Sequence, residues 1–304
     1  MTLPGAPTAP SRSLATRLVR VEHLMGTVVS VDVRDAVSAA EATPALDRFF
    51  ESLRDVDRRF SPWRPDSEIS RIADGRLAEA DASPDVRWVL AACDHLAATS
   101  GGAFDARGHD PDGRLDPSGF VKGWSVEEAA WNLTDAGLRN FAINAGGDVT
   151  VHGTPDPHSH DRPGWRVGIR NPDRIDAIAA VLEVRDLAVA TSGLYERGDH
   201  IRDPRTSIAP DTYRSFTVVG PSLAWADAYA TAGLVMGRDA LDWVASHPGC
   251  GAIAITPEGE LLWTEVAEPL LVLPVRAREA GSKIAAGSPE FSRSSQAPGL
   301  SWTP

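Results

Sequence analysis

Apolar residues recur at helical spacing in four stretches of the chain, which predicts four amphipathic or buried helices. Thr43-Pro44 and Ser83-Pro84 each place a capping hydroxyl before a proline, so they predict two helix starts. Gly101-Gly102 predicts the end of the second helix. The apolar stripes of the four predicted helices are Leu46, Phe49, Phe50, Leu53, Val56 and Phe60; Val86, Val89, Leu90, Cys93 and Leu96; Val126, Ala129, Ala130, Leu133 and Leu138; and Leu223, Ala226, Ala230, Leu234 and Val235.

Short apolar or alternating runs between these helices predict strands. Because many strands follow one another with few helices between them, the order predicts an α+β fold with a mostly antiparallel sheet and packed helices. We expect one compact domain at residues 18–277, a disordered arm at 1–17 and a flexible tail at 278–304. The predicted strands lie at residues 18–33 (two strands), 141–144, 149–151, 165–170, 182–184, 188–190, 216–219, 252–256 and 261–263.

Composition and charge narrow the class of protein. The chain of 304 residues is 42% hydrophobic and 24% charged, which is typical of a globular protein with a sizeable core. Its net charge of −12 argues against nonspecific binding to nucleic acid or to an anionic membrane. Cys93 and Cys250 lack metal-ligand spacing, so we expect two buried thiols. Residues 1–18 resemble neither a secretory signal nor a membrane span, and we expect a cytoplasmic protein without a membrane anchor.

An acidic residue on the predicted helix after Pro221 is the first candidate for chemistry. Asp227 and Thr231 are four residues apart, so both oxygens lie on one face of this apolar helix. A buried carboxylate costs several kcal/mol, to order of magnitude, unless a cation or hydrogen bonds compensate it. Mg²⁺ is one suitable partner, because it prefers oxygen ligands and substrate phosphate. The other interpretation is a partly solvated carboxylate, or one bonded to an arginine, near a helix start.

Further candidates have both a functional and a structural interpretation. Lys122 follows Gly119 at a predicted helix N-terminus, which attracts phosphate, although the Walker pattern is absent. Trp63 is either a lid over a planar ligand or a half-buried anchor. Asp105 either points into a cleft or caps a turn. Residues 191–206 combine hydroxyls, a glycine and a histidine, which is typical of a loop that forms a site wall.

Two further segments contain glycines at predicted turns, and the first of them has two interpretations. Gly26, inside residues 23–27, either lets the backbone approach a ligand or bends a strand. Residues 145–148 predict a tight Gly-Gly hairpin turn.

Taken in chain order, eight such segments resemble the ApbE-like flavin transferases, which are FAD:protein FMN transferases. Each segment is weak by itself, but eight in the family's order form a specific pattern over roughly residues 18–267. The segments are residues 25–27; 60–61 with 66–70; 103–105; 115–119 with 122–123; 144–148; 191–193 with 195–196; 200–201 with 203–206; and 226–228 with 231.

The resemblance implies a set of site residues. Asp227 and Thr231 match the family's metal-binding pair, with the carbonyls of Gly119 and Ala224 as further ligands of Mg²⁺. Asp227, Lys122 and His200 match the catalytic set, and His200 matches the general base that activates the acceptor hydroxyl. The positions that match flavin contacts are Met25, Trp63, Ala103, Phe104, Asp105, Asp116, Lys122 and Ile201.

The reaction that the resemblance implies is phosphoryl transfer. A Ser or Thr hydroxyl of an acceptor flavoprotein attacks the FMN phosphorus of FAD, and AMP leaves. Two alternatives stay open: a Mg²⁺-dependent FAD pyrophosphatase, in which water replaces the hydroxyl, and a flavin-binding carrier without turnover.

Three positions depart from the family's usual pattern. Pro117-Ser118 stands where small apolar residues or glycine are common, Ser207 stands where glycine is usual, and Trp63 often corresponds to tyrosine. A lipoprotein signal, usual in periplasmic members, is also absent, which supports the cytoplasmic expectation. None of these departures removes an expected ligand.

Overall fold

A computed structural model describes residues 17–108, 114–174, 176–194 and 201–272 of the chain. The expected C-terminal tail and all but one residue of the expected N-terminal arm lie outside these ranges. The predicted base His200 also lies outside them. The prediction of an α+β fold with an antiparallel sheet is confirmed by the strands and helices of the described residues.

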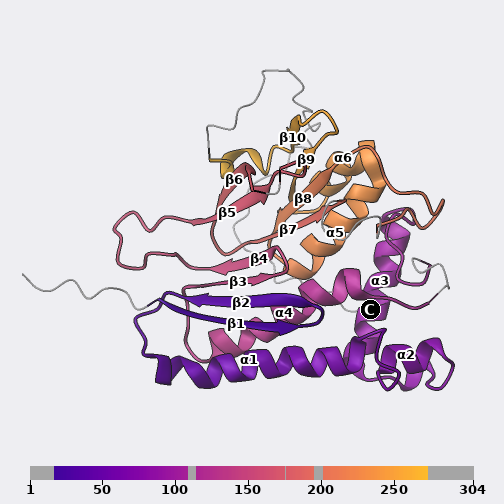
Figure 1. Cartoon of the computed structure of the whole chain (residues 1–304), viewed down its shortest axis with the longest axis horizontal. Helices are drawn as coiled ribbons and strands as arrows, with labels where there is room; N and C mark the ends of the chain where they lie inside the picture. Colours follow the sequence, from indigo (N-terminus) through magenta and orange to yellow (C-terminus); the bar gives the residue numbers. More distant parts are fainter. Residues whose placement is uncertain (1–16, 109–113, 175, 195–200, 273–304) are drawn as a thin grey trace, which may run out of the picture.

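The fold is built on an eight-stranded antiparallel sheet in the order β1-β2-β3-β4-β7-β8-β9-β10 (Figure 1). Two further strands, β5 and β6, pair only with each other within the described ranges. The strands predicted at 252–256 and 261–263 are confirmed as β9 and β10, which pair as an antiparallel hairpin. The strands are β1 (Leu18–Leu24), β2 (Thr27–Val33), β3 (Phe141–Ala145), β4 (Asp148–His152), β5 (Trp165–Arg170), β6 (Ile178–Val184), β7 (Ala188–Gly193), β8 (Ser215–Gly220), β9 (Gly251–Ile255) and β10 (Leu261–Trp263).

Four of the described helices follow the predicted apolar stripes, with corrections at two boundaries; one is that α4 ends at Asp135, before the predicted stripe residue Leu138. The predicted start at Thr43-Pro44 is wrong, because Ser38 and Glu41 form a capping box that begins α1 five residues earlier than Pro44. Pro44 is therefore accommodated inside the helix. The predicted start at Ser83-Pro84 is confirmed. The helices are α1 (Ala39–Phe60), α2 (Glu68–Ala73), α3 (Pro84–Thr99), α4 (Ser118–Asp135), α5 (Leu223–Met236) and α6 (Ala240–Ala245).

The two faces of the sheet bury two separate cores. Alternate residues of each strand point to opposite faces, so Ala190 and Val218 join the core under the helices, whereas Val189 and Val219 join the core under β5 and β6. In Figure 1, α1 runs alongside β1 and β2, and α5 lies against the sheet near β7 and β8. No helix of the described part has the length and apolar character needed to cross a bilayer.

The strand order brings three chain segments to one end of the sheet. The β1–β2 turn contains Met25 and Gly26, and the β3–β4 turn contains Gly146 and Gly147. The N–H of Gly146 donates to the carbonyl of Val28 at 3.0 Å, so these turns are neighbours. Because β7 runs antiparallel to β4, its last residues reach the same end. Segments far apart in sequence therefore converge beside α4 and α5.

Burial of His152 in β4 makes the stability of the fold pH-dependent. Its ring stacks on Phe141 at 4.5 Å between centroids, and burial lowers the pKa of the imidazole below its ordinary value. Stability from the neutral ring is present above the ordinary pKa, near 6.5, and is lost as the pH falls below it. We expect His152→Gln to reduce the loss of thermal stability between pH 7.5 and 5. Calorimetry measures this, and His158→Gln, at an exposed position, is the control. Equal pH slopes for wild type and His152→Gln would contradict the assignment.

Candidate functional site

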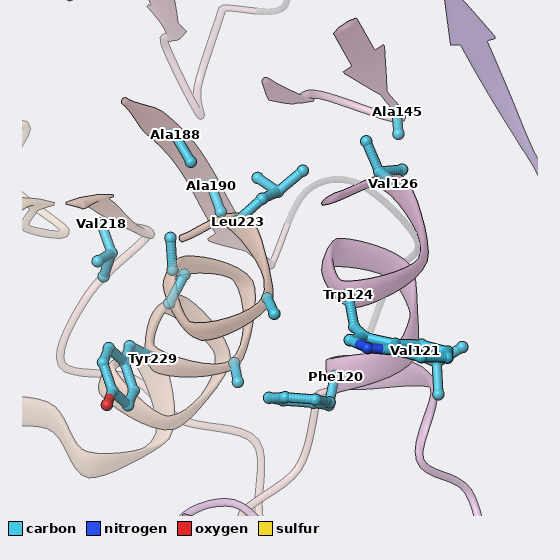
Figure 2. Packing of buried hydrophobic residues seen from close by; sticks show 14 of the residues in the cluster. Phe120, Val121, Trp124, Val126, Ala145, Ala188, Ala190, Val218, Leu223 and Tyr229 are labelled. Atoms are coloured by element: carbon cyan, nitrogen blue, oxygen red, sulfur yellow. The ribbon is translucent and has the colours of Figure 1, made fainter. Parts of the chain in front are cut away.

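The candidate site forms where the backbones of α4 and α5 come into near contact at Gly123. A Cβ atom added to Gly123 would lie 2.5 Å from the carbonyl oxygen of Leu223 and 3.0 Å from the Cα of Ala224. A glycine is required at this point because any side chain would force the helices apart. Figure 2 shows α4 and α5 side by side, with Phe120 of α4 directed toward α5.

This contact places Asp227 of α5 against the backbone of α4. The Asp227 side chain is only 5% exposed, and its Oδ2 accepts a hydrogen bond from the N–H of Gly123 at 3.1 Å. Lys122 Nζ lies 3.5 Å from Asp227 Oδ1. The pKa of Asp227 is raised to about 7; burial is the largest cause, the Lys122 charge opposes it, and the Asp148 charge adds to the rise. The interpretation of Asp227 as a solvated or arginine-bound carboxylate is therefore wrong, since its partner is a lysine.

Asp148 is a site residue that the sequence analysis treated only as part of a hairpin turn. It begins β4, is almost fully buried, and its Oδ2 lies 2.5 Å from Lys122 Nζ. Its Oδ1 accepts the N–H of Thr191 at 3.0 Å. Lys122 thus lies between two buried carboxylates, with the closer contact to Asp148. The sequence signal for Asp148 was its position directly before a predicted buried strand, because a buried carboxylate requires a cation or hydrogen-bond donors as partners.

Thr231 extends the same face of α5 toward the end of β7. Its Oγ1 lies 3.1 Å from the hydroxyl oxygen of Ser192, close enough for a hydrogen bond. The predicted juxtaposition of Asp227 and Thr231 on one helix face is seen. The oxygen atoms gathered here suit a hard cation such as Mg²⁺.

The donor set fits a metal that also binds its substrate. Within the described ranges, no group of three His, Cys, Asp or Glu side chains is placed to hold a metal ion. A site built from Asp227, hydroxyl and carbonyl oxygens is therefore incomplete until phosphate oxygens are added, which is usual for Mg²⁺ in phosphoryl-transfer enzymes.

The two predicted carbonyl ligands both stand in first turns of helices. Gly119 is the second residue of α4, and a Cβ there would lie 3.1 Å from the ring of Phe104. Ala224 is the second residue of α5, and its N–H donates to Glu127 Oε2 at 3.1 Å. The hydroxyl of Ser222 donates to the same oxygen at 2.7 Å. Glu127 of α4 therefore anchors the N-terminus of the helix that carries Asp227.

Some of the N–H groups in the first turn of α4 are already bonded within the chain. Asp116 Oδ1 accepts the N–H of Ser118 at 2.9 Å, and the carbonyl of Pro117 accepts those of Phe120 and Val121. Lys122 lies in the second turn of α4, so it acts through its ammonium group. Asp116 also donates its own N–H to the carbonyl of Ala106, which joins the two loops before α4.

Met25 occupies the β1–β2 turn in a conformation that side chains rarely adopt. Its φ of 53° is in the left-handed region, where glycine or asparagine is usual. The hydroxyl of Ser125 in α4 lies 3.6 Å from the Met25 sulfur, within hydrogen-bonding range. This contact brings the turn to within one helical turn of Lys122. Backbone strain of this kind is concentrated at functional sites, which supports the predicted ligand contact.

The other predicted flavin positions have different surroundings. Ala103 and Phe104 are buried beside the start of α4, and Asp105 Oδ1 accepts the N–H of Arg107 at 2.7 Å, as the turn-cap interpretation required. Trp63 is 78% exposed, so its interpretation as a half-buried anchor is wrong. Ile201 is buried in the core under the helices.

The loop at residues 201–207 packs against the end of α3 through Arg205. The Arg205 side chain lies 3.5 Å from the position of a Cβ on Gly102 and forms an ion pair with Asp203 at 2.8 Å. Ser207 has a φ of 59°, which explains why glycine is favoured there and marks the serine as a local strain.

Comparison with known proteins gives one consistent match. The model of the ApbE family matches residues 25–110 and 106–254. An FAD:protein FMN transferase from Rhodobacter capsulatus is 31% identical over 74% of this chain and 45% of its own length. One from Treponema pallidum is 26% identical over 84% of this chain and 88% of its own length. The chain spans about half the length of several of these curated relatives.

Solved structures show the same fold. The flavin transferase ApbE from Vibrio cholerae superposes with a TM-score of 0.73 at 22% identity, covering 84% of this chain and 100% of that one. The ApbE protein from Thermotoga maritima gives a TM-score of 0.71 at 21% identity, covering 84% and 99%.

Gly123→Ala tests the helix contact on which the site is built. The added methyl would overlap the backbone of Leu223, so we expect the free energy of unfolding to fall by roughly 1–3 kcal/mol. Urea denaturation measures the change. Gly119→Ala is the comparison, because its methyl meets only the edge of the Phe104 ring at 3.1 Å. A smaller cost at Gly123 than at Gly119 would contradict the proposed close contact.

Proposed function

The chain belongs to the ApbE family, and on that premise we propose that it transfers FMN from FAD to a hydroxyl group of an acceptor protein. The observation that carries the proposal is the buried cluster of Asp227, Lys122 and Asp148 beside Thr231. It gathers a cation and oxygen ligands at one point, as charge control over a diphosphate requires. The names of the relatives, FAD:protein FMN transferase, support the same activity.

Asp227 and Thr231 would hold Mg²⁺, with the carbonyls of Gly119 and Ala224 as the remaining protein ligands. When bound, the ion neutralises charge on the diphosphate of FAD. The buried position of Asp227 favours this role, because a divalent cation would offset the desolvation of its carboxylate.

Lys122 would bind the diphosphate oxygens with its ammonium group. Asp148 holds that group in place through the 2.5 Å ion pair, and Thr191 orients Asp148 from behind. Because Lys122 is closer to Asp148 than to Asp227, the carboxylate of Asp227 keeps an oxygen available for a metal.

The transfer step replaces the phosphoanhydride bond of FAD with a phosphoester bond to the acceptor. The oxygen of an acceptor Ser or Thr attacks the FMN phosphorus, a new P–O bond forms, and the P–O bond to AMP breaks. The hydroxyl proton passes to a base, and AMP leaves with the electron pair of the broken bond. We assign the base to His200 from the family resemblance alone. Met25, Trp63, Ala103, Phe104, Asp105, Asp116 and Ile201 would surround the flavin or its attached groups.

A co-expressed acceptor tests the proposal directly. Mass spectrometry of the acceptor should show an FMN adduct on Ser or Thr, with AMP released only when Mg²⁺ is present. FMN and AMP without an adduct would indicate FAD hydrolysis instead. Intact FAD in the presence of Mg²⁺ and an acceptor would indicate a carrier and would overturn the proposal.

Asp227→Asn should abolish Mg²⁺-dependent AMP release, with a loss of at least about 100-fold, because the variant removes the charged metal ligand. Chromatography of the reaction products measures the rate. In a separate experiment, Mg²⁺ with FAD should raise the unfolding temperature of the wild type but not of the variant. Asp242→Asn, at an exposed position on α6, is the control. Full activity of Asp227→Asn would exclude the metal assignment.

Asp148→Asn should weaken the response to Mg²⁺ without removing a predicted metal ligand. Without Asp148, Lys122 pairs fully with Asp227 and competes with the ion. We expect the Mg²⁺ concentration for half-maximal AMP release to rise roughly tenfold, which corresponds to about 1.4 kcal/mol. Asp148→Glu should restore part of the response. An unchanged Mg²⁺ dependence, with only a lower unfolding temperature, would assign Asp148 a purely structural role.

A further inference from the structure

A groove lies on the face of the sheet opposite the helices and is separate from the cluster around Asp227. Its volume is about 490 Å³. Strand β5 forms one wall, and the outer faces of β2, β3 and β4 form the floor, with Ser30, Asn144 and Val149 among the floor residues. The mechanism proposed above uses none of these side chains.

Strand β5 presents a free backbone edge to this groove. Within the described residues it pairs only with β6. The other edge of β6 is covered, because Leu182 bridges Leu271 and the N–H of Val272 donates to the carbonyl of Val181. An unpaired strand edge beside a groove is a template for an added strand.

The side chains of β5 favour a strand with negative charge. Arg166, Gly168 and Arg170 are exposed and line the groove, in a chain whose net charge is −12. Within the described residues, Arg166 has a long contact to Glu183, at 3.6 Å, whereas the Arg34 charge is already neutralised by Asp32 at 2.7 Å. The space over Gly168 is taken by Ile178, whose side chain would lie 3.1 Å from a Cβ at Gly168.

The floor continues toward β1 as an exposed apolar strip. Val21 pairs with Ser30 in the β1–β2 register, so both point to the face that carries the groove. Val19, Val21 and Val28 lie on this face and are 44%, 54% and 43% exposed. Such a strip suits the apolar side chains of a docked partner.

One end of the groove reaches the back of the candidate site. Gly147 and Thr191 line the groove, while Gly147 immediately precedes Asp148 and Thr191 donates its N–H to Asp148. Asp148 in turn contacts Lys122 at 2.5 Å. Thr191 and Asp148 therefore connect the end of the groove, on one face of the sheet, with the lysine on the other face that is proposed to bind the diphosphate.

We propose that this groove binds an extended, acidic segment of the acceptor protein, which adds as a strand to the free edge of β5. The inference rests on the proposed function for the identity of the partner, and on the two arginines and the edge of β5 that is unpaired within the described residues for its chemistry. The bound segment points toward the β3–β4 turn and so brings the acceptor hydroxyl to the transfer site.

The test uses the full-length protein and a synthetic probe, so it does not require a known acceptor. The probe is a fluorescein-labelled ten-residue peptide in which Asp alternates with Val and Thr; a second peptide has Lys in place of Asp. Fluorescence anisotropy should show saturable binding of the acidic peptide only. Arg166→Ala/Arg170→Ala should weaken it roughly tenfold, because two charge-assisted contacts are lost. The matched control Arg174→Ala/Arg185→Ala removes two exposed arginines outside the groove and should bind as the wild type does.

Backbone methylation distinguishes strand addition from simple charge attraction. Methylating the amide nitrogens of one alternate set of peptide residues should abolish binding, and methylating the other set should preserve it, because only one set faces β5.

Several outcomes would overturn the inference. They are no saturable binding of the acidic peptide, equal binding to the wild type and Arg166→Ala/Arg170→Ala, or equal effects of the two methylation patterns. A sedimentation shift of the wild type to a dimer that is lost in Arg166→Ala/Arg170→Ala would assign the groove to a second copy of the chain instead. If the peptide binds as expected but no acceptor receives FMN, the groove stands and the proposed function fails.

Discussion

The contact between α4 and α5 at Gly123 is the constraint on which the site depends. It lets a backbone N–H reach Asp227 and places Lys122 at the same carboxylate, so a buried acid gains a hydrogen bond and a cation. Glu127 of α4 also fixes the position of α5, because it accepts hydrogen bonds from Ser222 and Ala224 at the N-terminus of α5. Adding one methyl group at Gly123 would therefore disturb both the packing of α4 on α5 and the hydrogen bond to the Asp227 carboxylate.

Buried charge is costly, and this fold concentrates it at one end of the sheet. Asp148 and Asp227 share the single ammonium of Lys122, and burial raises the pKa of Asp227. This arrangement is poor for stability alone, because two carboxylates compete for one cation. It is well suited to a site that takes up a divalent cation together with an anionic substrate. The cation would supply the positive charge that the two carboxylates lack. The left-handed backbone of Met25 fits the same exchange of stability for function.

The sheet separates two surfaces that we propose bind two different partners. The helices cover one face and carry Lys122 and Asp227, which meet Asp148 of β4 there. The β5–β6 pair covers only part of the other face, and it leaves a groove whose end is lined by Thr191, the residue that donates its N–H to Asp148. A sheet that is one layer thick can therefore bring FAD from one side and an acceptor strand from the other to the same turn.

The sequence by itself determined the class of fold and singled out candidate residues for a site. Apolar periodicity located the long helices, because a helix must bury one face, and Asp227 and Thr231 were identifiable from their spacing of four residues. The tertiary structure decided what these residues contact. Strand pairing between β3, β4 and β7 brings Asp148 to Lys122, and no local pattern encodes that pairing. The α1 start was missed because a proline signal outweighed the capping box at Ser38. Local chemistry fixes elements, whereas long-range packing decides which charges meet.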